Sequence, residues 1–341
     1  MGWNSWYAFN ENVTDQLIRT QADAMIASGM VSAGYQYINI DDGWQGQRNS
    51  QGVLQSNAGF PDMKALGDYL HSRGLKFGIY TSMGSLTCGG HMGSLGYEQQ
   101  DAQTFVDWGV DFIKYDRCHL DTSNTQYEFR VLRFSQAVRS REKHPVILSI
   151  VVLNSPWEWA PVFAVNMWRL APDATDSFSN MLSISDTDSR LFAYSGAHEW
   201  NDPDILQVGH TGMSFEEYRT HMTLWIMLSA PLLAGLDLRN LTPPDLELLT
   251  NPDAISINQD PGAKQAQRIQ HGALDVWLRV LSKGWAVAVI NRSDQALNYT
   301  YSPVSLGISA TQTYDVWSKQ TVFTPQAFLI QPHGSLLLEA H

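Results

Sequence analysis

Lys114 and Asp116 stand two residues apart at the end of a short apolar stretch, in the segment DFIKYD. Side chains two positions apart leave the same face of an extended chain, so the ammonium group and the carboxylate are predicted to lie near each other. A nearby positive charge favours the ionised carboxylate, which can act as a nucleophile or bind a hydroxyl group. The pair therefore predicts a reactive site at the end of a strand.

Polar and aromatic side chains follow several other candidate strands at the same point. A single aspartate at a strand end is more often a helix cap or part of a loop ion pair than a functional group. Six carboxylates together are harder to explain in this way, because their mutual repulsion must be offset. The full set is Trp3, Trp6, Asp41, Asp42, Tyr80, Lys114, Asp116, Trp168, Arg169, Asp173, Asp202 and Asp204.

Two classes of reaction suit such a set. Hydrolysis of a glycosidic bond uses two carboxyl groups across a sugar, while further carboxylates bind hydroxyl groups and aromatic rings cover its apolar face. Metal-dependent chemistry would use the acids as ligands of Mg²⁺ or Mn²⁺. None of the ten histidines lies in a motif such as His-Glu-x-x-His, and the spacing of His119 and Asp121 is too common to indicate a site. These residues alone leave both classes open, and chelation would separate them; of the two we favour hydrolysis of a glycosidic bond, for which we expect no metal and no cofactor.

The elements that must position these residues alternate between short β-branched or aromatic runs and segments of helical period. The segment after Thr14, a typical N-cap residue, places Ile18, Ala22, Met25 and Ile26 on one face and ends near Gly29. Such alternation indicates right-handed βαβ units and a parallel sheet. Eight candidate strands precede residue 260, in the segments GWNSW, YQYINIDDGW, LKFGIYTS, DFIKYD, VILSIVVL, NMWRLAPD, WNDPDIL and SAPLLAGLDL.

Eight strands suit a closed (β/α)8 TIM barrel of about 250 residues, an α/β fold whose active site lies at the C-terminal ends of the strands. An open doubly wound sheet is the competing architecture, but no Gly-x-Gly-x-x-Gly or phosphate-loop motif supplies its usual ligand. After residue 262 the pattern changes, and the segments ALDVWLRVLSKGWAVAVINRSDQALNYTYS, TQTYDVWSKQTVF and GSLLLEA alternate apolar and polar residues with period two, which predicts a C-terminal antiparallel β-sandwich. We predict a catalytic barrel over residues 1–260 and a β-domain over residues 261–341.

The composition argues against several classes of partner. The formal net charge of -12 disfavours binding to nucleic acid or to an anionic membrane. The longest apolar run, 224–236, is short for a membrane span and contains Pro231 and Gly235, which favours a place in the core. No signal peptide is visible, and the sequence does not predict an oligomeric state. An exported eukaryotic protein is weakly favoured by four Asn-x-Ser/Thr sequons, at Asn12, Asn240, Asn291 and Asn298.

Long segments of the chain resemble glycoside hydrolase family 27, the family of α-galactosidases and α-N-acetylgalactosaminidases in clan D. These segments are MGWNSW, INIDDGW, GIYTS, FIKYDRC, MWRLAPDATDSF, WNDPDILQVGHTGMSFEEYRTH, SAPLLAGLDLRN and AISINQDPG. They follow the family's order through nearly the whole chain, which chance does not explain. The resemblance implies a (β/α)8 barrel with a C-terminal antiparallel β-domain, and hydrolysis of an oligosaccharide or polysaccharide.

The resemblance also assigns the two catalytic roles. The family's nucleophile motif, lysine-x-aspartate at the end of the fourth strand, makes Asp116 the nucleophile. The family segment Trp-Arg-x-x-x-Asp is WRLAPD here, which makes Asp173 the general acid/base. The implied mechanism retains the anomeric configuration, and it requires the two carboxyl groups to lie about 5–5.5 Å apart.

Other residues at the strand ends are implied to bind the sugar, and Asp202 is expected to be a structural hydrogen-bond partner. The substrate-binding residues that the family implies are Asp41 and Asp42 at the 4- and 6-hydroxyl groups, Lys114 at a hydroxyl group, Arg169 on the side of the 2-hydroxyl group, Trp6 and Tyr80 in the pocket walls, and Asp204 at the floor.

Cys88 and Cys118 are the two cysteines of the chain. By themselves they fit two buried free thiols as well as a disulfide. In the family, a bridge joins the loop after the third strand to the cysteine two residues beyond the nucleophile, and the two cysteines occupy these positions. The resemblance therefore implies a disulfide and an oxidising compartment, such as that of a secreted protein.

The fifth strand departs from the family pattern. In the galactosidases this strand usually ends in Cys-Glu-Trp, and the glutamate binds the 2-hydroxyl group. Here the segment is LSIVVLNSPWEW, which places Val152 or Asn154 at that position and Glu158 further along the loop. The contact at the sugar's 2-position is therefore expected to be altered. An α-galactosidase is the favoured activity, and the alternatives are an α-N-acetylgalactosaminidase, a β-L-arabinopyranosidase, an isomaltodextranase and a sugar-binding protein without catalysis.

Overall fold

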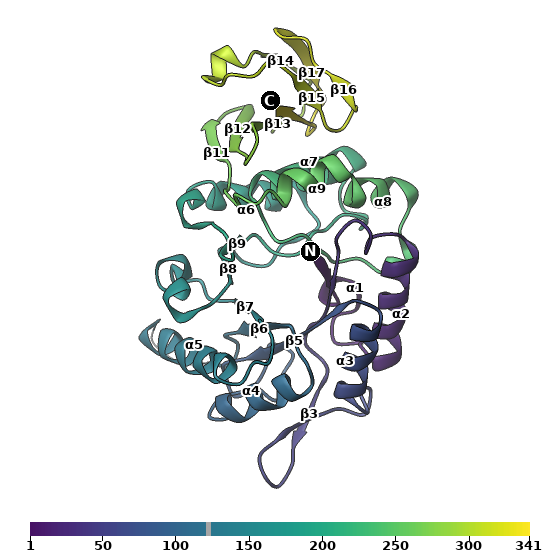
Figure 1. Ribbon diagram of the computed structural model, residues 1–341, viewed down its shortest axis with the longest axis vertical. Helices are drawn as coiled ribbons and strands as arrows, with labels where there is room; N and C mark the ends of the chain where they lie inside the picture. Colours follow the sequence, from purple (N-terminus) through teal and green to yellow (C-terminus); the bar gives the residue numbers. More distant parts are fainter. Residues whose placement is uncertain (121–123) are drawn as a thin grey trace. The chain divides into compact units, whose positions relative to one another are not determined.

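The computed structural model describes residues 1–120 and 124–341 and is shown in Figure 1. Asp121, considered above as a metal ligand, lies outside the described residues. By its internal contacts the chain divides into two compact units, and each unit combines two stretches of sequence. The first unit comprises Met1–Pro172 and Leu232–Thr242, and the second comprises Asp173–Pro231 and Pro243–His341.

The first unit holds seven of the eight barrel strands that the sequence predicts, paired in parallel in the order β10-β1-β2-β5-β6-β7-β8. The eighth strand, β9 (Trp200–Asp202), belongs to the second unit. The fold is thus a (β/α)8 barrel followed by an antiparallel β-domain, as predicted. The strands of the first unit are β1 (Gly2–Asn4), β2 (Tyr37–Ile40), β5 (Lys76–Ser82), β6 (Phe112–Asp116), β7 (Ile147–Ile150), β8 (Met167–Arg169) and β10 (Leu233–Ala234).

The parallel register sets the ends of neighbouring strands level with one another. Tyr80 of β5 pairs with Lys114 of β6, which in turn pairs with Ser149 of β7. One step further, Ser82 pairs with Asp116. Residues that are far apart in the sequence therefore meet at the carboxyl edge of the sheet, which is where the sequence predicts the site.

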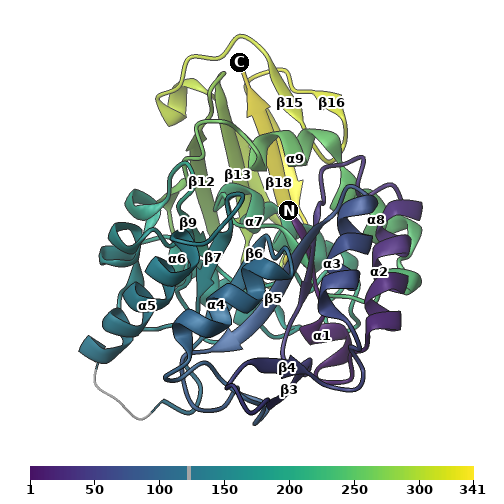
Figure 2. The ribbon, with the colours of Figure 1, turned by 60° about the horizontal axis from the view of Figure 1, so that its bottom comes forward.

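Helices follow the strands of the first unit. Thr14 caps α2 as predicted, because its Oγ1 accepts a hydrogen bond from the backbone N–H of Leu17 at 3.2 Å. Ile18, Ala22 and Met25 of this helix are fully buried, whereas Ile26 is half-buried. Figure 2 shows α2 beside α3. The helices are α1 (Trp6–Phe9), α2 (Asp15–Ala27), α3 (Met63–Ser72), α4 (Glu98–Asp107) and α5 (Asn124–Arg139), with short 3-10 turns η1 (Pro156–Glu158), η2 (Ala160–Phe163) and η4 (Leu238–Asn240).

A hairpin of β3 (Gln45–Arg48) and β4 (Leu54–Ser56) was not predicted. It follows the aspartates at the end of β2, and its residues are largely polar, so the sequence gives no alternation of apolar residues there. Arg48 fixes the hairpin by a bidentate ion pair with Asp101 of α4, with both N···O distances 2.7 Å. The partner of Arg48 is 53 residues away in the chain, so no local signal predicts this hairpin.

The second unit contains four helices of the barrel and the antiparallel β-domain. In Figure 2, strands β12, β13 and β18 lie side by side, in agreement with their pairing. A six-stranded sheet has the order β11-β12-β13-β18-β15-β16, and β14 pairs with β17. The elements are α6 (Phe178–Asp188), η3 (Phe192–Tyr194), α7 (Phe215–Met227), α8 (Pro243–Thr250), α9 (Pro252–Asn258), β11 (Gln267–Gln270), β12 (Leu274–Val280), β13 (Trp285–Asn291), β14 (Leu297–Tyr301), η5 (Val304–Leu306), β15 (Thr313–Asp315), β16 (Gln320–Thr321), β17 (Gln326–Ile330) and β18 (Ser335–Ala340).

The β-domain packs on helix α7. Thr220 Oγ1 of this helix donates to the carbonyl oxygen of His333 at 2.7 Å, and the hydroxyl groups of Thr223 and Ser335 are 3.0 Å apart. The division by contacts accordingly groups α6 to α9 with the β-domain. The boundary at residue 260 stays a prediction.

The apolar run 224–236 is buried almost throughout, and it forms the end of α7 and the strand β10. The prediction that it belongs to the core is confirmed. Among the described residues, no helix combines the length and the apolar character that crossing a membrane requires.

Candidate active site

Asp116 ends β6 and is 8 % exposed. Its Oδ1 accepts a hydrogen bond from the backbone N–H of Arg117 at 2.7 Å, and its Oδ2 accepts one from the hydroxyl group of Tyr80 at 3.1 Å. The Sγ atom of Cys88 lies 3.5 Å from the same Oδ2. This sulfur carries no hydrogen because it is part of a disulfide, so the approach is a contact and not a hydrogen bond. Two donors therefore hold the carboxylate in a fixed orientation.

Lys114 lies at the same strand end but binds a different carboxylate. Its ammonium group is 2.8 Å from Oδ2 of Asp41, and the side-chain amide of Asn4 donates to the same oxygen at 2.9 Å. The backbone N–H of Asp41 in turn donates to the hydroxyl group of Ser5 at 2.9 Å. The ends of β1, β2 and β6 are thus joined by one polar network.

The pKa of the Asp116 carboxyl group is raised above its usual value, because burial penalises its charged form. The charge of Lys114 and the hydrogen bonds from Arg117 and Tyr80 act in the opposite direction. The expected effect of the lysine is therefore present, but burial outweighs it. A sequence motif reveals the lysine, whereas it does not reveal how deeply the carboxylate lies.

The second carboxyl group at the end of β2, that of Asp42, is also buried, and burial raises its pKa. Its Oδ2 accepts from the backbone N–H of Gly89 at 2.8 Å, and its Oδ1 accepts from that of Gly43 at 3.0 Å. The disulfide of Cys88 and Cys118 joins the loop after β5 to the residues after β6, with its Cα atoms 5.0 Å apart. The implied disulfide is thus present, and it places Gly89 next to the carboxyl group.

Two aromatic residues that were predicted for the site differ in exposure. Tyr80 is 2 % exposed, and burial together with the charge of Asp116 raises the pKa of its phenol, so it stays a hydrogen-bond donor. Trp6 begins α1 and is half-buried. Asn4 was missed as a member of the network, although its position in the first strand, beside Trp3, could have indicated it.

The residues expected near the sugar's 2-position follow β7 and β8. Arg169 ends β8, is 2 % exposed, and donates from Nη2 to the carbonyl oxygen of Ala171 at 3.2 Å. Val152 is fully buried, Asn154 is half-buried, and Glu158 is exposed at the end of η1. Among the three candidates for the position of the family's glutamate, Val152 is therefore the residue shielded from solvent.

In the second unit, Asp173 is exposed and lies in the segment before α6. Asp204, two residues after the end of β9, accepts at Oδ2 a hydrogen bond from the backbone N–H of Ala174 at 2.8 Å. Asp202 is a structural partner as predicted, because its Oδ1 accepts from the backbone N–H of Asp204 at 2.9 Å. The carboxyl group of Asp204 thus binds the peptide unit directly after Asp173.

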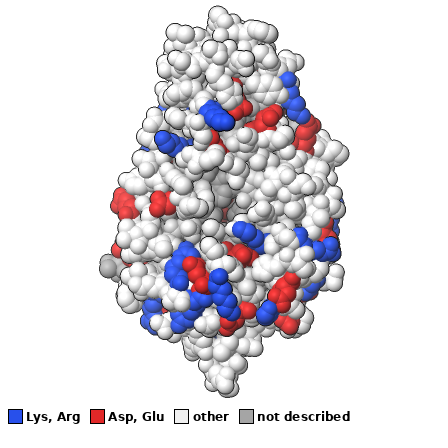
Figure 3. Space-filling model, in the orientation of Figure 1, with Lys and Arg blue, Asp and Glu red and all other residues white. Residues whose placement is uncertain are grey.

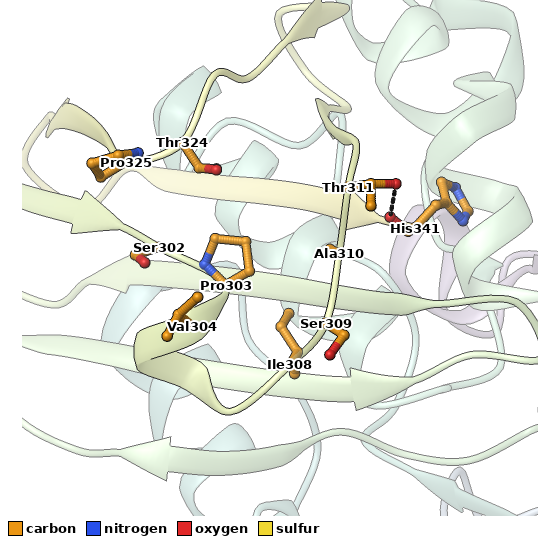
Figure 4. A pocket seen from close by; sticks show the side chains of 10 residues that line it. All are labelled: Ser302, Pro303, Val304, Ile308, Ser309, Ala310, Thr311, Thr324, Pro325 and His341. Atoms are coloured by element: carbon orange, nitrogen blue, oxygen red, sulfur yellow. Dashed lines mark hydrogen bonds between the residues drawn. The ribbon is translucent and has the colours of Figure 1, made fainter.

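Two other features of the described residues differ from this site in their chemistry. Acidic and basic side chains are interspersed on the face shown in Figure 3. The pocket of Figure 4 lies in the β-domain, has a volume of about 510 Å³, and is lined mainly by small apolar and hydroxyl side chains without a carboxylate. Asp186, His271 and Asp275 could reach one metal ion, but both carboxylates are bound by Arg268 and Arg292. Two arginines at those oxygens fit an ion-pair network and not a cation site.

A (β/α)8 barrel that carries carboxyl groups at the carboxyl ends of its strands suits a glycoside hydrolase, and the comparisons with known proteins decide the class. Residues 1–260 match the family model described as "Alpha galactosidase A", and residues 271–340 match "Alpha galactosidase C-terminal beta sandwich domain". The chain belongs to this family, glycoside hydrolase family 27, and is an enzyme of the glycoside hydrolase class.

Relatives share most of the chain. It is 41% identical over 318 residues to "Alpha-galactosidase A" of Cellvibrio japonicus, covering 88% of this chain and 78% of the relative. It is 40% identical over 348 residues to "Alpha-galactosidase 2" of Arabidopsis thaliana, covering 98% and 87%. The crystal structure of α-galactosidase I from Mortierella vinacea superposes with a TM-score of 0.94 at 31% identity and covers 100% of this chain and 96% of that one.

Proposed function

We propose that the protein is a retaining α-galactosidase that releases terminal α-D-galactose from oligosaccharides or polysaccharides. The observation that carries the proposal is the carboxyl group of Asp116, which is buried at the end of β6 and oriented by Tyr80 and by the N–H of Arg117. A nucleophile must be fixed against the anomeric carbon, and two hydrogen bonds provide such positioning. The relatives named above, which are called α-galactosidases, support the choice of sugar.

In the proposed reaction, an oxygen of Asp116 attacks the anomeric carbon while Asp173 gives its proton to the leaving glycosidic oxygen. The bond from carbon to the leaving oxygen breaks, and a covalent glycosyl-enzyme forms. Asp173 then takes a proton from water, the water oxygen attacks the same carbon, and Asp116 leaves as the carboxylate. Two inversions at one carbon give net retention.

We infer the binding roles from the resemblance to the family, and the contact between Lys114 and Asp41 supports two of them. Asp41 and Asp42 bind the 4- and 6-hydroxyl groups, and Lys114, which already contacts Asp41, donates to a neighbouring hydroxyl group. Arg169 lies toward the 2-hydroxyl group, Trp6 and Tyr80 form walls, and Asp204 closes the floor. Carboxylates suit this task because one carboxylate accepts hydrogen bonds from two hydroxyl groups.

A second candidate activity is favoured by the fifth strand, where Val152, Asn154 and Glu158 are the candidates for the position of the family's glutamate and Val152 is the fully buried one. Loss of a charge-assisted hydrogen bond to the 2-hydroxyl group removes about 1.5–3 kcal/mol of discrimination. The alternative is therefore one of the less common activities of the family: α-N-acetylgalactosaminidase, β-L-arabinopyranosidase or isomaltodextranase.

We also propose that the enzyme acts in an exported, oxidising compartment. The disulfide between Cys88 and Cys118 supports this, because such bonds persist outside the reducing cytosol. Its substrate is a carbohydrate, and we propose neither a nucleic acid nor a membrane as a partner. The proposed domain organisation is a catalytic barrel over residues 1–260 and a β-domain over residues 261–341.

The test is turnover of nitrophenyl glycosides in a panel of α-galactoside, α-N-acetylgalactosaminide, β-L-arabinopyranoside and α-glucoside. We expect the α-galactoside to be the best substrate, with the same activity in EDTA. Asp116→Asn is expected to fold and to lose turnover, and a fluorinated activated glycoside is expected to label Asp116 in the wild type. A preference for another glycoside would replace the galactosidase assignment, and full activity of the Asp116→Asn protein would remove Asp116 from the mechanism.

A further inference from the structure

The segment 173–177, which carries Asp173, is held by side chains that lie far from it in the sequence. At its start, the N–H of Ala174 donates to Asp204, as described above. At its other end, the carboxyl group of Asp176 accepts the hydroxyl hydrogen of Tyr218, with O···O distances of 2.8 and 3.0 Å to its two oxygens. The backbone N–H of Gly212 also donates to this carboxyl group. We call Tyr218 and Gly212, which bind Asp176, the anchor of the segment.

The surrounding structure fixes the position of Tyr218, the first member of the anchor. This residue is 3 % exposed and lies in the first turn of α7. A capping box formed by Ser214 and Glu217 fixes that turn, because each side chain bonds the other residue's backbone N–H. The hydroxyl group therefore has little freedom. Burial, together with Asp176, raises the pKa of the phenol, which keeps the hydroxyl group a donor.

Gly212 approaches Asp176 so closely that no larger residue fits. A Cβ atom at position 212 would lie 2.3 Å from the backbone oxygen of Asp176 and 2.7 Å from its Oδ2. Both distances are far below a van der Waals contact, and the first involves backbone, which cannot move aside cheaply. The loop before α7 is thus shaped to receive Asp176.

The other attachment of the segment also requires a specific backbone. The backbone of Asp204 has a φ of 84°, a value that residues other than glycine rarely adopt. Its N–H binds Asp202, and its carbonyl oxygen accepts from Nε1 of Trp225 at 2.8 Å. These bonds hold the strained conformation, in which the carboxyl group binds the N–H of Ala174.

We propose that Tyr218 is a positioning residue for the acid/base step, acting through Asp176 on the segment that carries Asp173. The proposal rests on the proposed function of Asp173 as the general acid/base. Asp173 is exposed, and its carboxyl group must come within hydrogen-bond distance of the leaving oxygen. Because the anchor holds Asp176, three residues further along, it limits the movement of the backbone that carries the Asp173 side chain.

The test compares two α-galactosides, one with an activated nitrophenyl leaving group and one a galactosyl disaccharide, whose leaving group needs protonation. Their kcat/KM values both report the first step. Tyr218→Phe removes the donor and keeps the ring. We expect kcat/KM for the disaccharide to fall at least fivefold more than kcat/KM for the nitrophenyl substrate. Asp176→Asn, which changes a half-buried residue, is expected to show the same selectivity if Tyr218→Phe is poorly folded.

The matched control is Tyr301→Phe. Its hydroxyl group is also buried in the second unit, and it lies 3.2 Å from Oγ1 of Thr313 within the β-domain. This variant loses a buried hydrogen bond between two neutral hydroxyl groups, which is weaker than the bond of Tyr218 to a carboxylate. It is remote in the sequence from the acid/base segment, so both substrates are expected to keep their wild-type ratio. A shift of that ratio in Tyr301→Phe as large as in Tyr218→Phe would show a general effect of lost stability and overturn the proposal.

Asp173→Ala separates the anchor from the catalytic assignment. We expect Asp173→Ala to lower kcat/KM for the disaccharide more than kcat/KM for the nitrophenyl substrate. Adding Tyr218→Phe to Asp173→Ala is expected to change this ratio little, since both residues act on one step. If Asp173→Ala is selective while Tyr218→Phe and Asp176→Asn affect both substrates equally, the anchor is refuted and the proposed function stands. If Asp173→Ala affects both substrates equally, the acid/base assignment fails and the anchor fails with it.

Discussion

At the scale of single residues, the site depends on a balance around one carboxyl group. Burial raises the pKa of Asp116, while Lys114, the N–H of Arg117 and the hydroxyl group of Tyr80 lower it. A nucleophile must be ionised at the working pH, and it is less strongly solvated when buried. The surrounding groups therefore offset part of the effect of burial and favour the carboxylate form.

This balance predicts a pH effect for Tyr80→Phe. The hydroxyl group donates to the ionised form of Asp116, so its removal leaves that form less stable and raises the pKa of the carboxyl group further. We expect the acidic limb of the profile of kcat/KM against pH to move to higher pH, with lower activity on its acidic side. The profile with a nitrophenyl α-galactoside measures this.

Tyr115→Phe is the control for that experiment. Tyr115 is adjacent to Asp116 in β6 and fully buried, but its ring stacks on Phe134 with 4.1 Å between ring centroids, on the side of the strand where α5 packs. The acidic limb of the profile of kcat/KM against pH is expected to be the same in Tyr115→Phe as in the wild type. An unchanged acidic limb in Tyr80→Phe, or an equal shift in both variants, would contradict the role given to the Tyr80 hydrogen bond.

At the scale of elements, the disulfide joins the loop after β5 to the end of β6 and closes a separation of 30 residues. The double variant Cys88→Ser/Cys118→Ser is expected to lose about 2–4 kcal/mol of stability, because its unfolded chain is less constrained. Activity is expected to fall as well, since the bridge holds Gly89 against Asp42. Thermal unfolding of the variant, and of the wild type with and without reductant, measures the effect. A melting temperature equal to that of the oxidised wild type would contradict the prediction.

Helix α7 carries a histidine that makes stability depend on pH. His221 is 1 % exposed, its Nε2 accepts from the backbone N–H of Gln207 at 3.2 Å, and its ring lies 4.0 Å from that of Trp225. Burial lowers the pKa of His221 to about 3, against 6.5 in the unfolded chain. Between these two pKa values the unfolded state binds more protons than the folded state. The stability that the buried neutral His221 contributes is therefore fully present above pH 6.5 and is lost as the pH falls toward 3.

In that pH window, protonation of His221 is expected to lower the free energy of unfolding by up to about 1.4 kcal/mol for each pH unit of acidification. His221→Gln keeps an acceptor for the N–H of Gln207 and cannot take up a proton. The difference in free energy of unfolding between wild type and variant is therefore expected to shift in favour of the variant as the pH falls from about 6.5. Denaturant unfolding at several pH values measures it. A difference that does not change with pH would refute the prediction.

At the scale of the whole molecule, the β-domain is integrated with helices of the barrel. Arg279 of β12 is fully buried, and its guanidinium group donates to the carbonyl oxygens of Ile226 and Asn258 and to the hydroxyl group of Ser229. These acceptors lie at the end of α7, just beyond it and at the end of α9. Burial lowers the pKa of Arg279 to about 10, so it stays charged at neutral pH.

A chain truncated after Asp260 is therefore expected not to fold, because α7 would lose Arg279 and the contacts of β18. Arg279→Met in the full chain is expected to cost about 1–3 kcal/mol, since buried carbonyl groups lose their donor. Circular dichroism and the cooperativity of thermal unfolding test both. A truncated protein that unfolds in one sharp transition would show that the barrel is independent and would favour the boundary at residue 260.

Local patterns in the sequence determined much of the architecture. The eight barrel strands, the N-cap at Thr14 and the strand-end pair of Lys114 and Asp116 depend on residues within a few positions of each other, so period and spacing predict them. Strands β11 and β17 were not predicted, since they are short and carry no strong alternation. The disulfide and the roles at the site came from the resemblance to a family, which compares whole segments and not single contacts.

Only the tertiary structure decided which residues meet. Lys114 binds Asp41, 73 residues away, and Tyr218 binds Asp176, 42 residues away. Asn291, the third sequon, is fully buried with its amide bound to backbone carbonyl groups, so the folded chain offers it no room for a glycan. Burial likewise outweighs Lys114 in setting the pKa of Asp116. The physical reason is the same in each case: burial and long-range hydrogen bonds depend on groups that the fold brings in from elsewhere in the chain, and no local pattern encodes them.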